Sequence, residues 1–389
     1  MIEMLGGVSL LCLFLVIYHH AGHPLVLIIA GRLSGSKQGA PPQRHDWPSI
    51  AILIPAFNEE EFIGDKLETL AGLDYPADRL RIVVACDGCT DETAAIARES
   101  AARWAEAGLR IEVLDFADNR GKLAVLNAVI PTLDADLVAL TDVSALISLD
   151  ALKRVAARFA DPDIGALVGT YKLFRPGGAG QGLYWRYQVL VKEMEARLGS
   201  VLGAHGAFYV IRKSLFKPLA PDTINDDFII PMQIIAQGYQ VGYDREIVAL
   251  ELEEVADRDE WRRRRRIAMG NIQQIFVLKN LLHPRFGWIS FNFWGGKLLR
   301  TTTPLLLIVT FITSFGASFE FIFFMILFIL QAVLYSGLAI AALLRPERLP
   351  RLGQLALYAA SGHFATLLSW WDVMRTGEFK VAWARPTRV

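Results

Sequence analysis

The chain has few cysteines and no excess of charge of either sign. Three cysteines in 389 residues indicate that its soluble part belongs in a reducing compartment. The 40 Lys and Arg residues balance the 40 Asp and Glu residues, so no overall basic field predicts binding to nucleic acid. Internal repeats and low-complexity segments are also lacking. These absences argue against a secreted disulfide scaffold, a nucleic-acid-binding protein and a repeat array.

The composition indicates two kinds of structure in one chain. Hydrophobic residues make up 53% and charged residues 21%, which is too apolar for an ordinary soluble domain and too charged for a pure membrane bundle. The first apolar run, Leu5 to Ala30, is long enough to span a bilayer. It lacks a basic segment ahead of it and is too long for a signal peptide. We expect a transmembrane helix at 1–33 and a linker at 34–48, rich in Gly, Pro and Gln.

Short apolar runs alternate with helical periodicity after the linker. The runs are rich in Ile, Val and Leu without polar alternation, as strands buried on both faces of a parallel sheet are. This alternation predicts a doubly wound α/β fold, with a mainly parallel sheet and helices on both faces. Ligands should bind beyond the carboxyl ends of its strands. The expected strands are 49–55, 80–85, 109–114 and 135–140, and the expected helices are 59–73, 91–107 and 122–130.

The C-terminal part returns to apolar segments. Residues 49–283 should form a cytoplasmic domain, because Glu3 precedes the first span and Arg32 follows it. Residues 284–376 should hold an interfacial helix and two or three transmembrane segments, followed by a basic tail at 377–389. Basic residues favour the cytoplasm both before and after the last apolar segment, 353–371, so a complete span and a re-entrant segment both stay open there.

Four clusters of polar residues fall where strands end. Pro55 to Glu60 closes the first strand, and Asp87 lies at the tip of the second, where an acidic residue can bind a base or ribose. Asp142 follows the fourth strand and can hold a divalent cation. Asp226 and Asp227 are paired carboxylates, of which one can become a general base. The alternatives are helix caps, turn-forming residues and an acidic helix start.

Together the clusters resemble the membrane-bound family-2 glycosyltransferases, which have the A-type nucleotide-sugar fold. The resemblance covers about Ile50 to Ile275 and extends to bacterial enzymes that make exopolysaccharides and glycolipids. It implies an inverting hexosyl- or N-acetylhexosaminyltransferase with a nucleotide-sugar donor, UDP being favoured. It also implies a Mg2+ or Mn2+ ion at Asp142, although Ser144 replaces the second aspartate of the family's metal motif.

The resemblance assigns a role to individual residues. Asp227 matches the catalytic base, and Asp226 takes the place of the glutamate before it. Cys89 replaces the usual serine of the loop that contacts uracil, so Cys86 and Cys89 need no redox or zinc explanation, although a C-x-x-C pair permits one. The resemblance implies that the donor-binding residues are Pro55, Phe57, Asn58, Glu59, Asp87, Lys122, Asp142 and Arg266.

A loop and a basic run complete the expected site. Gly203, His205 and Gly206 match the loop that presents the acceptor, where His205 is either a second proton carrier or a structural histidine. The run Arg262 to Arg266 matches the Gln-x-x-Arg-Trp motif, with Arg266 on phosphate and outer arginines on anionic lipid. Ile267 replaces the tryptophan that stacks on the acceptor sugar in processive synthases. This departure argues against chain elongation.

Three functional hypotheses follow. The first is an integral protein of the bacterial inner membrane that glycosylates a lipid, a lipid-linked glycan or another membrane-proximal acceptor. The second is a processive polysaccharide synthase. The third is a membrane partner subunit with a nucleotide-binding fold and no turnover, which the presence of Asp87, Asp142 and Asp227 together argues against. A transporter would need more spans and more intramembrane charge.

Overall fold

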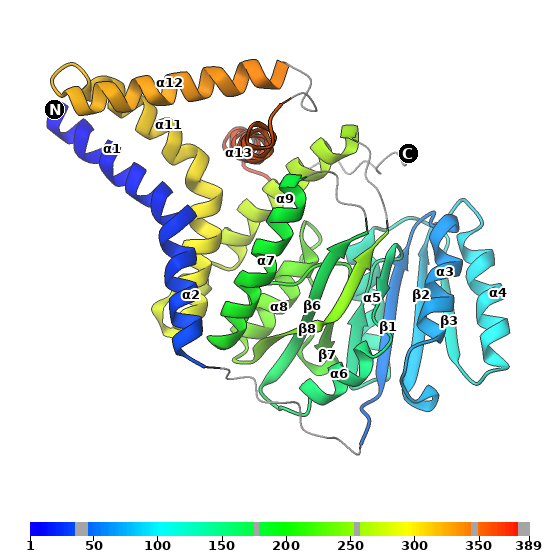
Figure 1. Cartoon of the computed structure of the whole chain (residues 1–389). Helices are drawn as coiled ribbons and strands as arrows, with labels where there is room; N and C mark the ends of the chain where they lie inside the picture. The colour runs from blue at the N-terminus through cyan, green and yellow to red at the C-terminus, as the bar shows by residue number, and fades with distance from the viewer. Residues whose placement is uncertain (36–45, 175–178, 253–256, 344–348, 380–389) are drawn as a thin grey trace. The chain divides into compact units, whose positions relative to one another are not determined.

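The computed structural model describes residues 1–35, 46–174, 179–252, 257–343 and 349–379. The chain divides into two compact units, and each is described by itself (Figure 1). The sheet unit comprises the described residues within 31–175 and 188–254. The helical unit comprises those within 1–30, 176–187 and 255–389.

The sheet unit contains a mixed sheet with eight strands in its described part, in the order β3-β2-β1-β4-β7-β6-β8-β5. Strands β1 to β4 are parallel where they pair, while β7 is antiparallel to both β4 and β6. Strand β8 runs parallel to β6, and β5 pairs antiparallel with β8. The strands are β1 Ile50–Ala56, β2 Leu80–Asp87, β3 Arg110–Phe116, β4 Leu137–Leu140, β5 Ala145–Ile147, β6 Ile164–Leu173, β7 Tyr209–Arg212 and β8 Gln240–Glu251.

Helices connect the parallel strands β1 to β4. Helices α3 (Glu60–Ala71) and α4 (Thr93–Ala105) carry the chain from β1 outward to β3, and they pack against each other (Figure 1). Helix α5 (Lys122–Val129) then returns the chain to β4, on the other side of β1. The direction of winding therefore reverses between β1 and β4, which is where open α/β sheets bind ligands.

The sequence pattern accounts for these central elements. Ile52, Leu53 and Ile54 in β1 are completely buried, as expected for a strand covered on both faces. The expected first four strands and three helices are confirmed, with ends that differ from the expected ones by about two residues. The expected α/β architecture, with a mainly parallel sheet and helices, is confirmed as well.

The second half of the sheet unit departs from simple alternation. Helix α6 (Ala151–Arg158) packs on β6 and β8, and helix α8 (Asp226–Ala236) packs on the same two strands. Helix α7 (Ala179–Arg197) continues into the sheet unit, where Met194 and Ala196 are buried. This burial indicates that the C-terminal part of α7 is a packing helix of the sheet unit.

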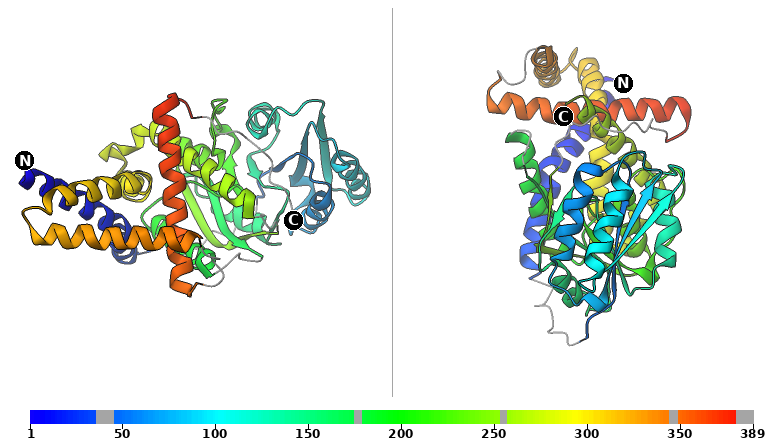
Figure 2. Two further views of the ribbon diagram at one scale, coloured as in Figure 1. Left: turned by 90° about the horizontal axis from the view of Figure 1, so that it is seen from above. Right: turned by 90° about the vertical axis from the view of Figure 1, so that its right-hand side faces the viewer.

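The helical unit contains the apolar segments at both ends of the chain. Among the described residues, three helices are long and apolar enough to cross a membrane: Ile2–Leu33, Trp288–Ala317 and Ile322–Leu343. The first combines α1 (Ile2–Ile17), a π-helical turn at Tyr18–Gly22 and α2 (His23–Leu33). The second combines α10 (Trp288–Asn292), a π-helical turn at Phe293–Leu298 and α11 (Leu299–Ala317), which packs beside α1 (Figure 2). The third is α12.

Helices α9 (Asp257–Val277) and α13 (Arg351–Thr376) pack against each other in the same unit. The guanidinium of Arg264 hydrogen-bonds the hydroxyl of Ser361 and lies 4.2 Å from the ring centroid of Tyr358. Arg265 pairs with Asp372. Two arginines of the basic run therefore connect α9 to α13, whereas the sequence predicted a contact with anionic lipid for the outer arginines.

Candidate active site

The loops that follow β1 and β2 are joined by hydrogen bonds. Asn58 adopts a left-handed backbone conformation (φ 54°), which asparagine tolerates better than most residues. Its Oδ1 accepts from the backbone N–H of Thr90 at 2.7 Å, and the backbone N–H of Glu59 donates to Thr93 Oγ1 at 2.6 Å. Pro55 lies within β1, and Phe57 is the first residue after that strand. The expected opening loop of the donor site is thus held in one conformation.

The two cysteines of the C-x-x-C pair are free thiols, with Cys86 in β2 and Cys89 in the loop after it. Cys86 is completely buried, and Cys89 Sγ accepts a hydrogen bond from the backbone N–H of Asn58 at 3.4 Å. Burial raises the pKa of the Cys86 thiol to about 12, and the adjacent Cys89 adds to the effect. The described residues include no group of three or more His, Cys, Asp or Glu side chains that could hold a metal ion. This geometry favours a packing role for both thiols.

Asp87 is buried at the tip of β2, with only 4% of its surface exposed. Its two carboxylate oxygens accept backbone N–H bonds from Arg120 at 3.1 Å each and from Gly121 at 2.7 Å. Gly88 (φ 68°) permits this close approach, because a Cβ atom there would lie 2.3 Å from the backbone nitrogen of Asn119. Asp87 therefore fixes the start of α5. If Asp87 also contacts the nucleotide base, as the sequence predicts, the same carboxylate has both roles.

Helix α5 begins at Lys122, which joins two of the expected site carboxylates. Its Nζ lies 2.9 Å from Asp142 Oδ1 and 3.7 Å from Asp226 Oδ2. The side chains of Lys122 and Asp142 are 34% and 39% exposed, so solvent and ligands can reach them. Asp226, at 14% exposure, is more enclosed. The structure thus brings Lys122, Asp142 and Asp226 together beyond the carboxyl end of β4.

The loop at residues 203–206 lies against the same carboxylates. The backbone N–H of Gly206 donates to Asp227 Oδ2 at 3.1 Å, and that of Ala204 donates to the Asp227 carbonyl oxygen at 2.9 Å. A Cβ atom on Gly206 would lie 3.0 Å from Asp142 Oδ2 and 3.7 Å from Lys122 Nζ. A side chain at this position would press on the Asp142 carboxylate, because the loop passes close to both side chains. The expected base and the expected acceptor loop are therefore in direct contact.

His205 stacks on the ring of Tyr171, with 3.6 Å between the ring centroids. Its Nδ1 accepts a hydrogen bond from the backbone N–H of Ala207 at 3.4 Å. The histidine also interacts electrostatically with Asp142. The stacking holds the ring in place beside the site, which favours the structural interpretation of His205 over that of a second proton carrier.

Electrostatics keep the lysine and the carboxylate charged. Burial acts to raise the pKa of Asp142, but the ammonium of Lys122 more than offsets it, and the net pKa lies below the usual value. Burial likewise acts to lower the pKa of Lys122, and the carboxylates of Asp142, Asp226 and Asp227 more than reverse that effect. At neutral pH the site therefore contains an ammonium surrounded by carboxylates, an arrangement that can bind the phosphates of a nucleotide and accept a proton.

Three residues that sequence reasoning missed support this arrangement. Lys66 on α3 is completely buried and donates to Thr141 Oγ1 at 2.8 Å and to the Ala145 carbonyl oxygen, on either side of Asp142. Lys192 on α7 donates to the Gly203 carbonyl oxygen at 3.1 Å. The third is Tyr209, whose pKa is raised by burial and by the nearby carboxylates. Lys66 shares one face of α3 with the apolar residues Ile63, Leu67 and Leu70, and this is the one signal that could have been found in advance.

The side chains around Asp142 offer a cation few ligands. Asp142 Oδ1 faces the Lys122 ammonium, and Ser144 is buried at 7% exposure. The protein would supply one carboxylate, and a diphosphate and water would supply the other oxygens, as is common for Mg2+. This donor set fits a cation that arrives with its nucleotide.

Arg266 lies on α9 in the helical unit, apart from the unit that holds the carboxylates. Its expected contact with donor phosphate stays a prediction.

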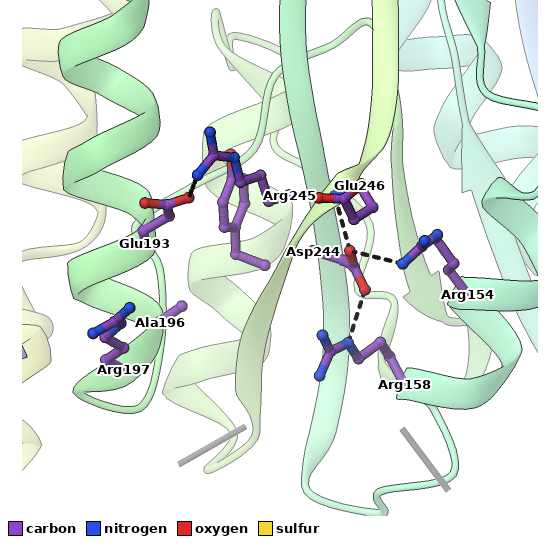
Figure 3. A pocket seen from close by; sticks show the side chains of 9 residues that line it. Arg154, Arg158, Glu193, Ala196, Arg197, Asp244, Arg245 and Glu246 are labelled. Carbon is purple, nitrogen blue, oxygen red and sulfur yellow. Dashed lines mark hydrogen bonds and ion pairs between the residues drawn. The ribbon is translucent and has the colours of Figure 1, made fainter. Parts of the chain in front are cut away.

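A pocket of about 310 Å3 lies elsewhere in the sheet unit, between α6, α7 and β8 (Figure 3). Ion pairs cross it, with Asp244 bonded to Arg158 at 2.9 Å and Arg245 bonded to Glu193 at 3.0 Å. Its charges are largely paired, and it contains none of the expected site residues. The lining residues are Arg154, Arg158, Glu193, Ala196, Arg197, Tyr243, Asp244, Arg245 and Glu246.

Comparison with known proteins identifies the class. The sequence model described as glycosyltransferase like family 2 matches residues 48–266, more than half of the chain. The chain therefore belongs to glycosyltransferase family 2, and it is an enzyme of that family.

Curated relatives come from several bacteria. The chain is 33% identical over 121 residues to the beta-monoglucosyldiacylglycerol synthase of Synechocystis sp., a match that covers 31% of this chain and 25% of that protein. It is 26% identical over 243 residues to the probable glycosyltransferase YdaM of Bacillus subtilis, covering 60% of this chain and 57% of that one. The chain thus spans between a quarter and about half of these relatives.

Two further similarities cover more of the chain. An N-acetylglucosaminyltransferase of Rhizobium meliloti is 22% identical over 315 residues, covering 76% of this chain and 72% of that protein. Among solved structures, a mannosyltransferase from Pyrobaculum calidifontis in complex with GDP-Man and Mn2+ is 22% identical. It matches with a TM-score of 0.69 over 94% of this chain and 99% of that one. At this identity the structural match shows the fold alone.

Proposed function

We propose that this enzyme transfers a sugar from a nucleotide-sugar donor to a lipid or lipid-linked acceptor at the membrane. UDP is the nucleotide that we expect in the donor. Relatives named as a glycolipid synthase and as poly-beta-1,6-N-acetyl-D-glucosamine synthases support a glycolipid or polysaccharide product. Three helices that are long and apolar enough to span a membrane support an acceptor of this kind. The positive residues that follow the first span favour a catalytic unit on the cytoplasmic side.

The observation that carries the proposal is the contact between Lys122, Asp142, Asp227 and the backbone of Gly206. The ammonium of Lys122 is placed to bind a donor phosphate and to stabilise the charge that the leaving diphosphate develops. A cation held by Asp142 and the diphosphate would add to that stabilisation when bound. Phosphate binding would also draw Lys122 away from its carboxylates, which frees Asp142 for the cation.

Asp227 serves as the base in this proposal. The Gly206 N–H holds one carboxylate oxygen in place, so the group is oriented before the acceptor arrives. As the acceptor oxygen attacks the anomeric carbon, its proton passes to Asp227, the new glycosidic bond forms and the bond to the nucleoside diphosphate breaks. Attack from the face opposite the leaving group inverts the anomeric configuration. Lys192, bonded to the Gly203 carbonyl, positions the loop beside the acceptor.

A processive polysaccharide synthase is the second candidate, favoured by the relatives that make a poly-N-acetylglucosamine. Ile267, where processive members carry a tryptophan, favours single transfer instead. A non-catalytic partner subunit, the third hypothesis, is not retained as a candidate, because the chain is an enzyme of family 2.

The test is turnover by the full chain in membranes. UDP-glucose, UDP-N-acetylglucosamine and GDP-mannose are each supplied with Mn2+ or Mg2+, and lipid products are measured by mass spectrometry. We expect a lipid carrying one added sugar and the matching free nucleoside diphosphate. A ladder of products would establish the processive alternative, and the absence of diphosphate release with every donor and metal would reject the enzyme's proposed reaction.

A further inference from the structure

Two charged side chains near the end of α7 bind the backbone at the start of the loop formed by residues 202–206. The carboxylate of Glu195 accepts a hydrogen bond from the backbone N–H of Leu202 at 3.1 Å. The ammonium of Lys192 donates to the Gly203 carbonyl oxygen at 3.1 Å and to that of Leu202 at 3.5 Å. Because the two residues are three positions apart on a helix, their side chains are neighbours. We call Lys192 and Glu195 the loop clamp.

Helix stability does not account for the carboxylate of the clamp. Glu195 lies in the last turn of α7, which ends at Arg197, and only 5% of its surface is exposed. A carboxylate in that turn meets the negative end of the helix dipole, and burial of its charge is costly as well. Burial also lowers the pKa of Lys192, an effect that the carboxylates of Glu195 and Asp227 offset only in part. The hydrogen bonds to the loop are the favourable contacts that this pair makes in such a position.

The loop connects the clamp to the proposed base. Directly after the clamped residues, the backbone N–H of Ala204 donates to the Asp227 carbonyl oxygen at 2.9 Å, and that of Gly206 donates to Asp227 Oδ2 at 3.1 Å. Gly203 has a φ of 65°, and a Cβ atom there would lie 2.2 Å from Cδ2 of Phe228. The loop is therefore bonded to the clamp and packed against the start of α8, which carries Asp227.

The chain just before the loop is fixed independently of the clamp. The backbone N–H of Val241, in β8, donates to Ser200 Oγ at 2.8 Å. The backbone N–H of Val201 donates in turn to the Val241 carbonyl oxygen at 3.0 Å. Loss of the clamp should therefore loosen the loop at residues 202–206 and leave the strand and the end of the helix in place.

We propose that Glu195 is a positioning residue for Asp227 and acts, together with Lys192, through the loop. By fixing residues 202–203, the clamp keeps the Gly206 N–H on the Asp227 carboxylate, so the base is oriented before the acceptor arrives. The predicted effect on sugar transfer rests on the proposed function, in which Asp227 is the base. The donor's phosphates bind elsewhere in that proposal, so the clamp governs the transfer step and leaves donor affinity unchanged.

The first test measures the loop without any substrate. Hydrogen–deuterium exchange of the purified full chain in nanodiscs, read by mass spectrometry, follows the peptide that contains residues 202–207. Glu195→Leu removes an acceptor from the Leu202 N–H and should speed exchange there by about tenfold. Glu195→Gln keeps an acceptor oxygen and should stay within about threefold of the wild type. The matched control Glu193→Leu, which removes the partner of Arg245 from the same helix, should leave this exchange unchanged.

The second test measures transfer by the same variants in membranes. The donor is whichever of UDP-glucose, UDP-N-acetylglucosamine and GDP-mannose gives a lipid product with the wild type. We expect Glu195→Leu to lower the single-turnover transfer rate by at least about tenfold while the donor Kd changes by less than about threefold. Glu195→Gln should recover most of that rate, and Glu193→Leu should match the wild type. A donor Kd that rises as much as the rate falls, or no recovery with glutamine, would overturn the proposal.

A shorter acid keeps the proposal testable where the leucine variant does not fold. Glu195→Asp retains the charge but withdraws the carboxylate from the Leu202 N–H, so it should also speed exchange of the loop, by about threefold or more. Unchanged loop exchange in this variant, with normal transfer by the wild type, would reject the clamp and leave the proposed function standing. Faster exchange in a chain whose wild type forms no product with any donor would retain the clamp and reject the proposed function.

Discussion

Among single residues, Lys66 has the least expected environment. It is completely buried, and it bonds Thr141 and Ala145 on both sides of Asp142. Burying an ammonium is unfavourable, and burial lowers the pKa of Lys66 to about 7, an effect that the carboxylates of Asp142 and Glu251 offset only in part. Lys66 thus holds the segment from Thr141 to Ala145 in place, and we regard it as a positioning residue for Asp142.

Lys66→Met should affect the KM for the donor more than it affects the stability of the fold. The change preserves side-chain length but leaves the Ala145 carbonyl without this donor, which should lower the free energy of unfolding by about 1–3 kcal/mol. The looser segment should raise the donor KM by about tenfold. Thermal unfolding and steady-state kinetics of the full chain measure both. Lys153→Met, which removes an exposed lysine paired with Asp74, is the control and should change neither.

Cys86 should be unreactive at moderate pH. Because its pKa is raised to about 12, only about one thiol in ten thousand is ionised at pH 8, and the reactive fraction should increase about tenfold for each pH unit above that. Alkylation by iodoacetamide in folded protein, read by mass spectrometry, should modify Cys89 well before Cys86. Equal labelling at pH 8, or a disulfide between the two, would restore the redox interpretation.

At the scale of elements, the site depends on two loops that meet at Gly88. Gly88→Ala would place a Cβ 2.3 Å from the Asn119 backbone in a left-handed conformation, so we expect a loss of at least about 3 kcal/mol in unfolding free energy and weak donor binding. Gly108 (φ 80°) has open space around it, so Gly108→Ala should cost only about 1 kcal/mol. Similar losses in both variants would show that the contact with Asn119 is unimportant.

The parallel half of the sheet could be predicted because local hydrophobic patterns in the sequence specify its strands and helices. Runs such as Ile50 to Ile54 are buried on both faces, and helical periodicity separates them. The grouping of Asp142 with Asp227 followed only from the resemblance, since the two residues are 85 positions apart and no local pattern joins them. The antiparallel strand β7 and the contacts of Lys66 and Lys192 depend on tertiary packing, which periodicity does not report.

At the scale of the whole molecule, the membrane segments determine which side the sheet unit occupies. Arg32 follows the first candidate span, so the sheet unit should face the cytoplasm. A single cysteine at the exposed position Glu106, in a chain with its own cysteines replaced by serine, should react with a membrane-impermeant maleimide in inside-out vesicles and stay unlabelled in intact cells. Labelling of intact cells would reverse the proposed topology.

The central claim is that Asp227 takes the acceptor's proton while Asp142 and Lys122 bind the donor's diphosphate. The most direct measurement compares single-turnover sugar transfer and donor affinity in Asp227→Asn and Asp142→Ala, both in the full chain. We expect Asp227→Asn to lower the transfer rate by at least about a hundredfold with donor affinity nearly unchanged. Asp142→Ala should weaken metal-dependent donor binding by about tenfold or more. Equal loss of donor binding in both variants, or full transfer by Asp227→Asn, would contradict the account.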